Sequence, residues 1–175
     1  MENKKTIIVT GGARGIAKAV TKAYVSEGAT VAVFDILDEL GQQTVAEANE
    51  KGPGKAFYFN CDISNKSAVD AAFKEAIDAL GGIDVLANIA GVDRNTPTID
   101  TTNEEFDFIM NINVRGTMLT NQAAFNVMAK QGFGNIINFG SDTGLVGAPG
   151  QAIYGASKAA VMSWTRTIAN EWGRL

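Results

Sequence analysis

Tyr154 and Lys158 stand four residues apart in the alanine-rich run "IYGASKAAV", which is expected to be helical. Side chains at this spacing share one helix face, so the phenol and the ammonium are expected to be neighbours. A nearby ammonium favours the phenolate, which makes the tyrosine a competent proton donor or acceptor. Because the same spacing also arises by chance, its meaning depends on the other residues of the chain.

The chain contains no histidine, which removes the commonest proton-transfer group. A Ser-His-Asp triad, a Cys-His dyad and a histidine-ligated metal are therefore excluded, and no metal site is expected. Cys61 is the only cysteine, which excludes an internal disulfide and a zinc site built from cysteines. Any proton chemistry must therefore use Tyr, Lys, Ser, Asp or Glu.

Two other polar residues are candidates for a catalytic site. Ser141 follows the apolar run "NIINFG", at the expected carboxyl end of a strand, although serine is also common in loops and at helix N-termini. Asn113 lies between Ile112 and Val114 in a predicted helix, where a buried amide needs a hydrogen-bond partner. Taken alone, Asn113 is interpreted as a satisfied core amide, and Ser141 as either a loop residue or a catalytic group.

A glycine-rich turn, "TGGARGIAKAV", follows the first apolar run. Gly11, Gly12 and Gly15 leave little side chain there, so a pyrophosphate can approach backbone N–H groups at a helix N-terminus. The alternative is an ordinary strand-to-helix turn. The position between a predicted strand and an amphipathic helix favours nucleotide binding.

Asp35 stands at the end of the second apolar run, at the spacing beyond the glycines where a dinucleotide-binding carboxylate is expected. Its carboxylate can bind the adenosine ribose hydroxyls and would repel a 2′-phosphate, so NAD is expected and NADP is less favoured. Arg14 favours NADP instead, since a guanidinium near the ribose can bind the 2′-phosphate. A helix N-cap is the alternative for Asp35, because a helical pattern follows it.

Two further segments follow predicted strands. Asp62, in "CDIS", is expected either to contact adenine or to cap the next helix. Asn88 belongs to "ANIAG", whose small residues stand along the path expected for a cofactor, and a plain strand-to-loop turn is the alternative.

Five short apolar runs are expected to be strands, at residues 6–10, 30–34, 56–60, 83–88 and 135–139. Helices are expected at roughly residues 14–27, 37–51, 66–80, 103–131 and 152–172. Near-continuous apolar strands that alternate with helices predict an open, doubly wound α/β fold with a parallel sheet buried on both faces. Ligands of such a sheet bind beyond the carboxyl ends of its strands, which is where the glycines gather.

Length and composition predict a single domain spanning residues 1–175. The hydrophobic share of 46% and the charged share of 19% are typical of a globular protein, and no apolar run is long enough to span a membrane. The net charge of −4 gives no basic surface for nucleic acid. The N-terminus lacks the pattern of a secretory signal, so a cytoplasmic protein without nucleic-acid or membrane partners is expected.

Taken together, the motifs resemble those of the classical short-chain dehydrogenase/reductase family, from residue 6 to about residue 172. The matching residues, in chain order, are Thr10-Gly-x-x-x-Gly15-x-Ala17, Asp35, Asp62, Asn88-Ile-Ala-Gly91, Asn113, Ser141 and Tyr154-x-x-x-Lys158. The resemblance implies a Rossmann fold with strand order 3-2-1-4-5. It also implies nicotinamide-cofactor contacts from Gly11, Arg14, Gly15, Ile16, Asp35, Asp62, Ile63, Asn88, Ala90, Gly91, Tyr154 and Lys158.

The same resemblance implies roles for four residues. Tyr154 would be the general acid in carbonyl reduction or the base in alcohol oxidation, and Ser141 would hydrogen-bond the substrate oxygen. Lys158 would favour the tyrosinate and hold the nicotinamide ribose hydroxyls, while Asn113 would anchor a water in a proton relay. The implied activity is that of an NAD(P)-dependent alcohol dehydrogenase or carbonyl reductase, including the 3-oxoacyl type, with a small alcohol or carbonyl substrate.

Three departures from the family pattern stand out. Ala17 replaces the usual third glycine and Ile89 the usual second asparagine, and both changes are minor. The chain also ends after "ANEWGRL", where the family continues, so the family's last strands and the segment that closes over substrate are expected to be lacking.

This shortened end has consequences for association and activity. The fifth predicted strand becomes an edge that favours pairing with another chain. A homo-oligomer, either a dimer or a tetramer, is expected through the fourth and fifth predicted helices, together with poor turnover. The alternative function is a nucleotide-binding or assembly subunit with little turnover. Loops 92–101 and 142–152 are expected to line the substrate pocket, but they do not identify the substrate.

Overall fold

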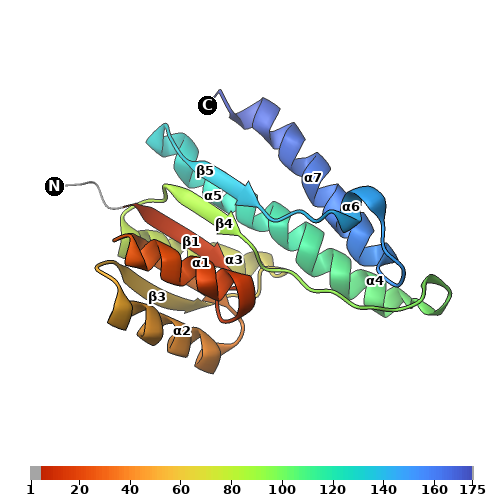
Figure 1. Cartoon of the computed structure of the whole chain (residues 1–175). Coiled ribbons are helices and arrows are strands. Elements are labelled where there is room, and N and C mark those ends of the chain that lie inside the picture. Colours follow the sequence, from red (N-terminus) through yellow and green to blue (C-terminus); the bar gives the residue numbers. More distant parts are fainter. Residues whose placement is uncertain (1–4, 175) are drawn as a thin grey trace.

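Five parallel strands form one sheet in the order β3-β2-β1-β4-β5, which confirms the order expected from the sequence (Figure 1). The computed structural model describes residues 5–174. The strands are β1 (Thr6–Thr10), β2 (Thr30–Asp35), β3 (Lys55–Asn60), β4 (Val85–Asn88) and β5 (Asn135–Asn138). Thr10 lies opposite Phe34 of β2 and Asn88 of β4, so the carboxyl ends of these three strands meet at one edge of the sheet.

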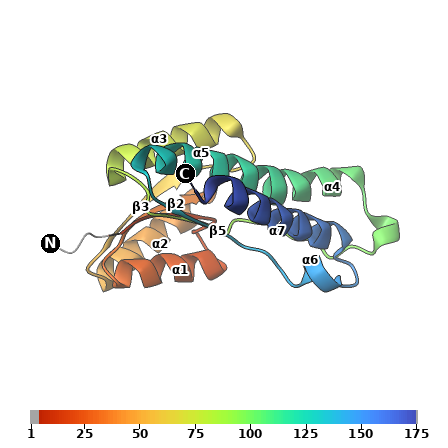
Figure 2. The ribbon, with the colours of Figure 1, turned by 90° about the horizontal axis from the view of Figure 1, so that it is seen from above.

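Helices cover both faces of the sheet, which confirms the doubly wound α/β fold. They are α1 (Gly15–Ser26), α2 (Asp38–Lys51), α3 (Lys66–Leu80), α4 (Asn103–Met110), α5 (Thr117–Gln131), α6 (Thr143–Val146) and α7 (Ala152–Trp172), with a 3₁₀ turn, η1 (Thr98–Asp100), and a π-helical segment, η2 (Asn111–Gly116). In Figure 2, α1 and α2 lie on one side of the sheet, and α3 and α5 lie on the other. α7 packs against α4, η2 and β5. Within residues 5–174, no helix has both the length and the apolar character that a membrane crossing requires.

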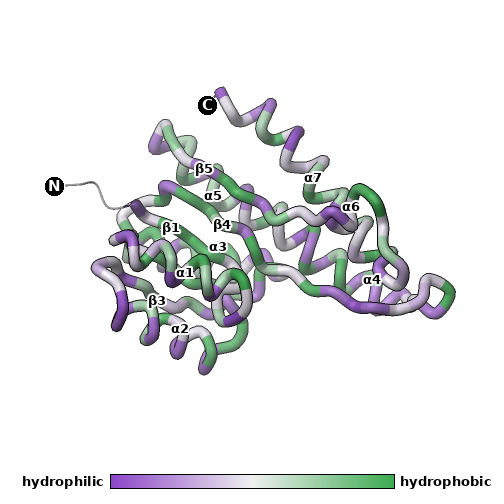
Figure 3. The backbone as a smooth tube through the Cα atoms, viewed as in Figure 1, coloured by the Kyte–Doolittle hydropathy of each residue, from purple (hydrophilic) through white to green (hydrophobic). Residues whose placement is uncertain are grey.

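The central strands are buried on both faces. Ile7, Ile8 and Val9 of β1 are 0% exposed, as are the four residues 31–34 of β2. Figure 3 shows hydrophobic residues concentrated along these strands. β5 lies at one edge of the sheet, as expected, and its Ile137 is 40% exposed. The buried centre is a rigid platform for the side chains at the carboxyl edge.

Local signals set the ends of two long helices. The side chain of Asn65 accepts a hydrogen bond from the backbone N–H of Ala68 and so caps the start of α3. Gly81 and Gly132 follow α3 and α5 with φ values of +79° and +77°, in the left-handed region that favours glycine. Each helix therefore stops where the chain must turn back toward the next strand.

The helix expected over residues 103–131 is interrupted. The structure divides it into α4, the π-helical segment η2 and α5. Asn113 in η2 is 1% exposed, and the Thr117 hydroxyl donates to its backbone oxygen over 2.7 Å. π-Helical turns inside α-helices are often found at functional sites, because they redirect side chains.

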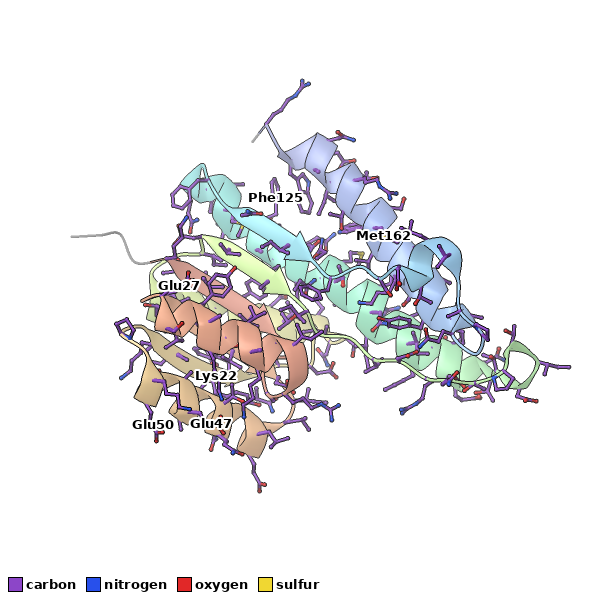
Figure 4. All side chains as sticks on the ribbon, in the orientation of Figure 1. Lys22, Glu27, Glu47, Glu50, Phe125 and Met162 are labelled. Atoms are coloured by element: carbon purple, nitrogen blue, oxygen red, sulfur yellow. The ribbon has the colours of Figure 1, made fainter. Side chains whose placement is uncertain are left out.

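An acidic residue ties α1 to α2 on one face of the sheet. Glu47 of α2 pairs with Lys22 of α1, and both are labelled in Figure 4. Glu47 also pairs with Lys18 of α1 at 3.1 Å. The two ammonium groups lower the pKa of Glu47 to about 2, and Lys22 has the larger effect. The pairs lie near the surface, so their net contribution to stability is small.

Phe34 is expected to carry a large share of the core packing. Its ring is 0% exposed and makes edge contacts with Phe59 at 5.9 Å and Phe73 at 5.3 Å. Phe34→Ala should lower the free energy of unfolding by about 3–5 kcal/mol, because it removes buried apolar surface and leaves a cavity. Urea unfolding measures the loss.

The control, Phe133→Ala, removes a ring that is 60% exposed and should cost no more than about 0.5 kcal/mol. Equal losses in the two variants would contradict this assignment of the core.

Candidate active site

A cleft of about 490 Å³ opens at the carboxyl ends of β1, β2 and β4. Nine of the twelve residues expected to contact a cofactor line it, and these are Gly11, Arg14, Gly15, Ile16, Asp35, Asp62, Ile63, Ala90 and Gly91. Another cleft of similar volume, about 510 Å³, lies between β5, α5 and α7 and contains none of these residues. The fold therefore gathers most of the expected cofactor residues around one opening.

The glycine-rich turn leaves space for a ligand's phosphates. Gly11 has a φ of +73°, and a Cβ on it would lie 2.8 Å from the Cα of Ala90, so the turn lies close to the loop that follows β4. Gly15 has a φ of +60°, and a Cβ on it would meet no atom within 4 Å. Arg14, the N-cap residue of α1, makes no capping bond with its side chain, which leaves the first N–H groups of the helix available to an anion. These residues fit the pyrophosphate of a dinucleotide.

Asp35 links the glycine-rich turn to the start of α2. Its Oδ2 accepts a hydrogen bond from the N–H of Ala13 at 3.0 Å, and its Oδ1 accepts one from the N–H of Leu37 at 3.1 Å. Leu37 occupies the N-cap position of α2, so the alternative that Asp35 is the helix cap is wrong. The carboxylate lies in the wall of the cleft and adds negative charge there.

Asp62 and Ile63 form another part of the cleft wall. Asp62 is exposed, and its Oδ1 accepts hydrogen bonds from the N–H and the hydroxyl of Ser64, at 2.9 and 2.7 Å. Asn65 caps α3, so the capping alternative for Asp62 is also wrong. Ile63 packs against η2, where a Cβ on Gly116 would lie 2.7 Å from its Cδ1.

Asn88 does not line the cleft. Its side chain is 3% exposed; its Oδ1 accepts a hydrogen bond from the Thr10 hydroxyl at 2.9 Å, and its Nδ2 donates to Asn138 at 3.2 Å. The Thr10 oxygen also accepts from the N–H groups of Ile89 and Ala90, both at 3.0 Å. The Asn88 side chain therefore lies beneath the loop that forms the cleft wall.

Lys158 is a buried cation beside Tyr154. It is 6% exposed, its Nζ lies 5.7 Å from the centre of the Tyr154 ring, and it donates to the backbone oxygen of Phe139 at 2.8 Å. A Cβ on Gly91 would lie 3.5 Å from this Nζ, so the lysine also adjoins the loop after β4. Burial lowers the pKa of Lys158, because removal from water disfavours the charged form.

Asn113 fixes the loop after β4 to α7. Its Oδ1 accepts from the N–H of Val92 at 2.8 Å, and its Nδ2 donates to the oxygen of Val92 at 2.9 Å and to Ser157 at 3.0 Å. Both amide hydrogens are therefore used, which agrees with a satisfied core amide. Its role as a water anchor stays a prediction.

Ser141 and Tyr154 come from neighbouring segments that pack closely. The Ser141 oxygen accepts a hydrogen bond from the N–H of Thr143 at 3.2 Å, and its hydroxyl donates to Asp142, also at 3.2 Å. Tyr154 is half-buried in the first turn of α7. The next residue, Gly155, permits the approach, because a Cβ there would lie 3.0 Å from the backbone oxygen of Thr143. α6 and the start of α7 are thereby held together.

Ser157 also belongs to this site, although no sequence pattern predicted it. It is 0% exposed; it accepts the hydrogen bond from Asn113, and its hydroxyl donates to the backbone oxygen of Tyr154 at 2.7 Å. Its position directly before Lys158 could have drawn attention to it, but serine in a helix has no distinctive local pattern.

Comparison with known proteins gives a consistent match. A family model described as short chain dehydrogenase matches residues 5–175. A curated relative, cyclopentanol dehydrogenase from Comamonas sp., is 41% identical over 167 residues, which are 95% of this chain and 66% of the relative. The chain therefore spans about two thirds of the length of this relative.

Solved structures match the fold closely. A crystal structure of levodione reductase superposes with a TM-score of 0.94 at 31% identity, covering 97% of this chain and 67% of that one. A crystal structure of NAD⁺-bound xylitol dehydrogenase gives a TM-score of 0.93 at 29% identity, with 99% and 67% of the two chains covered.

The buried ammonium of Lys158 is expected to destabilise the fold at neutral pH. Because its folded pKa lies below the unfolded value of about 10.4, the unfolded chain binds more protons between these two values, and stability rises with pH there. Lys158→Met should therefore be more stable than the unchanged protein at pH 7, and this advantage should shrink toward pH 10. Urea unfolding at both pH values measures it.

The matched control is Lys74→Met, which removes an exposed lysine paired with Asp78. Its effect should be small and nearly independent of pH. A Lys158→Met protein that is less stable at pH 7 would show that the bond to Phe139 outweighs the cost of burial.

Proposed function

The chain belongs to the short-chain dehydrogenase family, and we propose that it forms the catalytic part of an oxidoreductase that interconverts an alcohol and a carbonyl compound. The observation that carries this proposal is the buried Lys158 beside Tyr154, next to a cleft lined by the residues expected to hold a dinucleotide. Histidine is absent, so Tyr154 is the proposed acid and base.

The proposed chemistry divides between cofactor and chain. A nicotinamide cofactor held by the residues of the cleft would supply or accept the hydride. In alcohol oxidation Tyr154 takes the hydroxyl proton, and in carbonyl reduction it returns a proton to the oxygen. The Ser141 hydroxyl hydrogen-bonds the same oxygen, and Lys158 stabilises the phenolate. Asn113 holds the Val92 loop against α7.

NAD is the proposed cofactor, with NADP less favoured. Asp35 places a carboxylate in the cleft wall, and a 2′-phosphate about 4–5 Å away would be repelled by roughly 3–4 kcal/mol per unit charge at an effective dielectric near 20. The NAD⁺-bound xylitol dehydrogenase supports the same choice. Arg14 lines the same cleft and is the one basic residue among the residues of the described range 5–174 that line it.

The substrate is proposed only as a class, a small alcohol or ketone. A relative named for cyclopentanol makes cyclic alcohols the first compounds to test, together with polyols and 3-oxoacyl thioesters. The alternative, a nucleotide-binding or assembly subunit, is not favoured because Asn113, Ser141, Tyr154 and Lys158 are all present. The cytoplasmic location and the homo-oligomer stay predictions.

Tyr154→Phe tests the proposed chemistry. NAD⁺ or NADH is mixed with the substrate panel, and NADH absorbance is followed. The variant should lose at least about 10²-fold in turnover, because a positioned proton donor contributes that much, while NADH affinity stays within a few-fold by fluorescence titration. Tyr24→Phe, in α1, is the control and should keep full turnover. Unchanged turnover in Tyr154→Phe would remove this residue from the mechanism.

Asp35→Ser tests the cofactor preference. Removing the carboxylate should raise affinity for NADPH relative to NADH by about tenfold or more. Affinity for both cofactors should also fall, because the carboxylate binds the N–H of Ala13 in the glycine-rich turn. Asp38→Ser is the control, since Asp38 bonds Tyr58 and Asn60 and does not line the cleft. If the unchanged protein binds NADPH as tightly as NADH, Arg14 outweighs Asp35.

A further inference from the structure

A network of amide side chains joins the carboxyl end of the sheet to α5 and α7. Asn138, the last residue of β5, is its centre. Its Nδ2 donates to Asn121 of α5 at 2.9 Å and to the hydroxyl of Thr165 of α7 at 3.0 Å. Its Oδ1 accepts from Asn121 at 2.9 Å and from Asn88 of β4 at 3.2 Å. One side chain therefore contacts three different elements.

The network is buried at Asn88 and Asn121 and half-buried at Asn138 and Thr165, and its amide groups are paired. Asn121 is 0% exposed, and its Oδ1 also accepts from the indole N–H of Trp164 at 3.0 Å. Both amide hydrogens of Asn138 are donated, and its oxygen accepts two bonds. Satisfied networks of this kind hold one geometry, because any shift would leave a buried polar atom unpaired.

Phe139 connects this network to the candidate active site. It follows Asn138 directly, its N–H donates to the backbone oxygen of Asn88 at 3.2 Å, and its own oxygen accepts from Lys158 at 2.8 Å. The planar peptide between Asn138 and Phe139 sets the position of the Phe139 Cα, to which the Phe139 carbonyl is attached. The acceptor that holds the Lys158 ammonium thus lies one residue beyond an amide that is bonded to β4, α5 and α7.

We propose that Asn138 is a positioning residue for Lys158, which it holds in place through the carbonyl of Phe139 while Thr165 ties α7 to the same amide. The effect of Asn138 on turnover rests on the function proposed above. Its effect on the position and proton affinity of Lys158 does not. Asn138 acts through the backbone of Phe139 and does not itself transfer a proton.

The surroundings of Lys158 make its proton affinity a sensitive readout. Tyr154 is the titratable group in contact with it, and no acidic oxygen within residues 5–174 lies within 4.0 Å of its Nζ. The bond to Phe139 stabilises the charged form against burial. Loss of that bond should lower the titration midpoint further.

Gln131 provides a matched control at the far end of α5. Its amide ties the helix to the segments that precede β4 and β5, accepting from the N–H of Ile83 at 2.9 Å and donating to the oxygens of Ile83 at 2.8 Å and Phe133 at 3.3 Å. None of these bonds adjoins Lys158. Gln131→Ala should therefore destabilise the fold without changing Lys158.

The first test follows the Cε resonance of Lys158 by NMR across a pH titration, with isotope-labelled lysine and Lys158→Met to assign the signal. In Asn138→Ala the midpoint should fall by about half a pH unit or more, which is about a threefold change in the acid dissociation constant of Lys158. In Gln131→Ala the midpoint should stay within about 0.2 pH units of that of the unchanged protein. If Asn138→Ala does not fold, Thr165→Val removes a single acceptor of the network and should shift the midpoint in the same direction. An unchanged midpoint in a folded network variant, or equal shifts in Gln131→Ala, would overturn the proposal.

The second test is kinetic. On an alcohol that the unchanged protein oxidises, Asn138→Ala should lower kcat by about tenfold or more with KM within about threefold, because small misplacements of a catalytic group cost this much. Gln131→Ala should keep kcat within about twofold. A kcat in folded Asn138→Ala that matches the control contradicts the positioning role. Absence of turnover in the unchanged protein would count against the proposed function alone, since the NMR titration still decides the role of Asn138.

Discussion

The junction of β1 and β4 is the interaction on which the candidate site depends. Here Thr10 and Asn88 lie opposite each other, and the threonine hydroxyl donates to the asparagine over 2.9 Å. The same oxygen accepts two N–H groups from the loop beyond β4. The strand order reverses direction at this pair, so the crossovers on its two sides diverge and leave a cleft between them.

Two amide side chains, the buried Asn113 and the half-buried Asn138, extend this junction toward α7. Asn113 reaches the helix through Ser157, and Asn138 reaches it through Thr165. Each amide is bonded to the sheet or to the loop after β4 as well, so α7 is tied to the carboxyl edge at two places. Tyr154 and Lys158 therefore lie on a helix whose position is set by directional bonds, which packing of apolar side chains alone would not achieve.

The site departs from the rules that stabilise the rest of the fold. Lys158 is a buried cation whose pKa is lowered by burial, the N-cap residue of α1 makes no side-chain capping bond, and η2 breaks a long helix. Such features cost stability and are tolerated where a protein binds or reacts. The apolar strands and the aromatic cluster around Phe34 supply the stability that these departures reduce.

The strands and most of the helices could be predicted from the sequence, because apolar periodicity and glycine turns are local signals. The strand order and several of the cleft residues followed from the resemblance to a known family. The π-helical segment could not be predicted, since Asn113 bonds a residue 21 positions away. Likewise, the sequence placed Asn88 correctly at the end of a strand, yet its partner Asn138 lies 50 residues further on. The sequence by itself determined which residues stand at the carboxyl edge of the sheet. Only the tertiary structure decided which of their side chains face the cleft and which are buried amides, because that choice depends on contacts between distant parts of the chain.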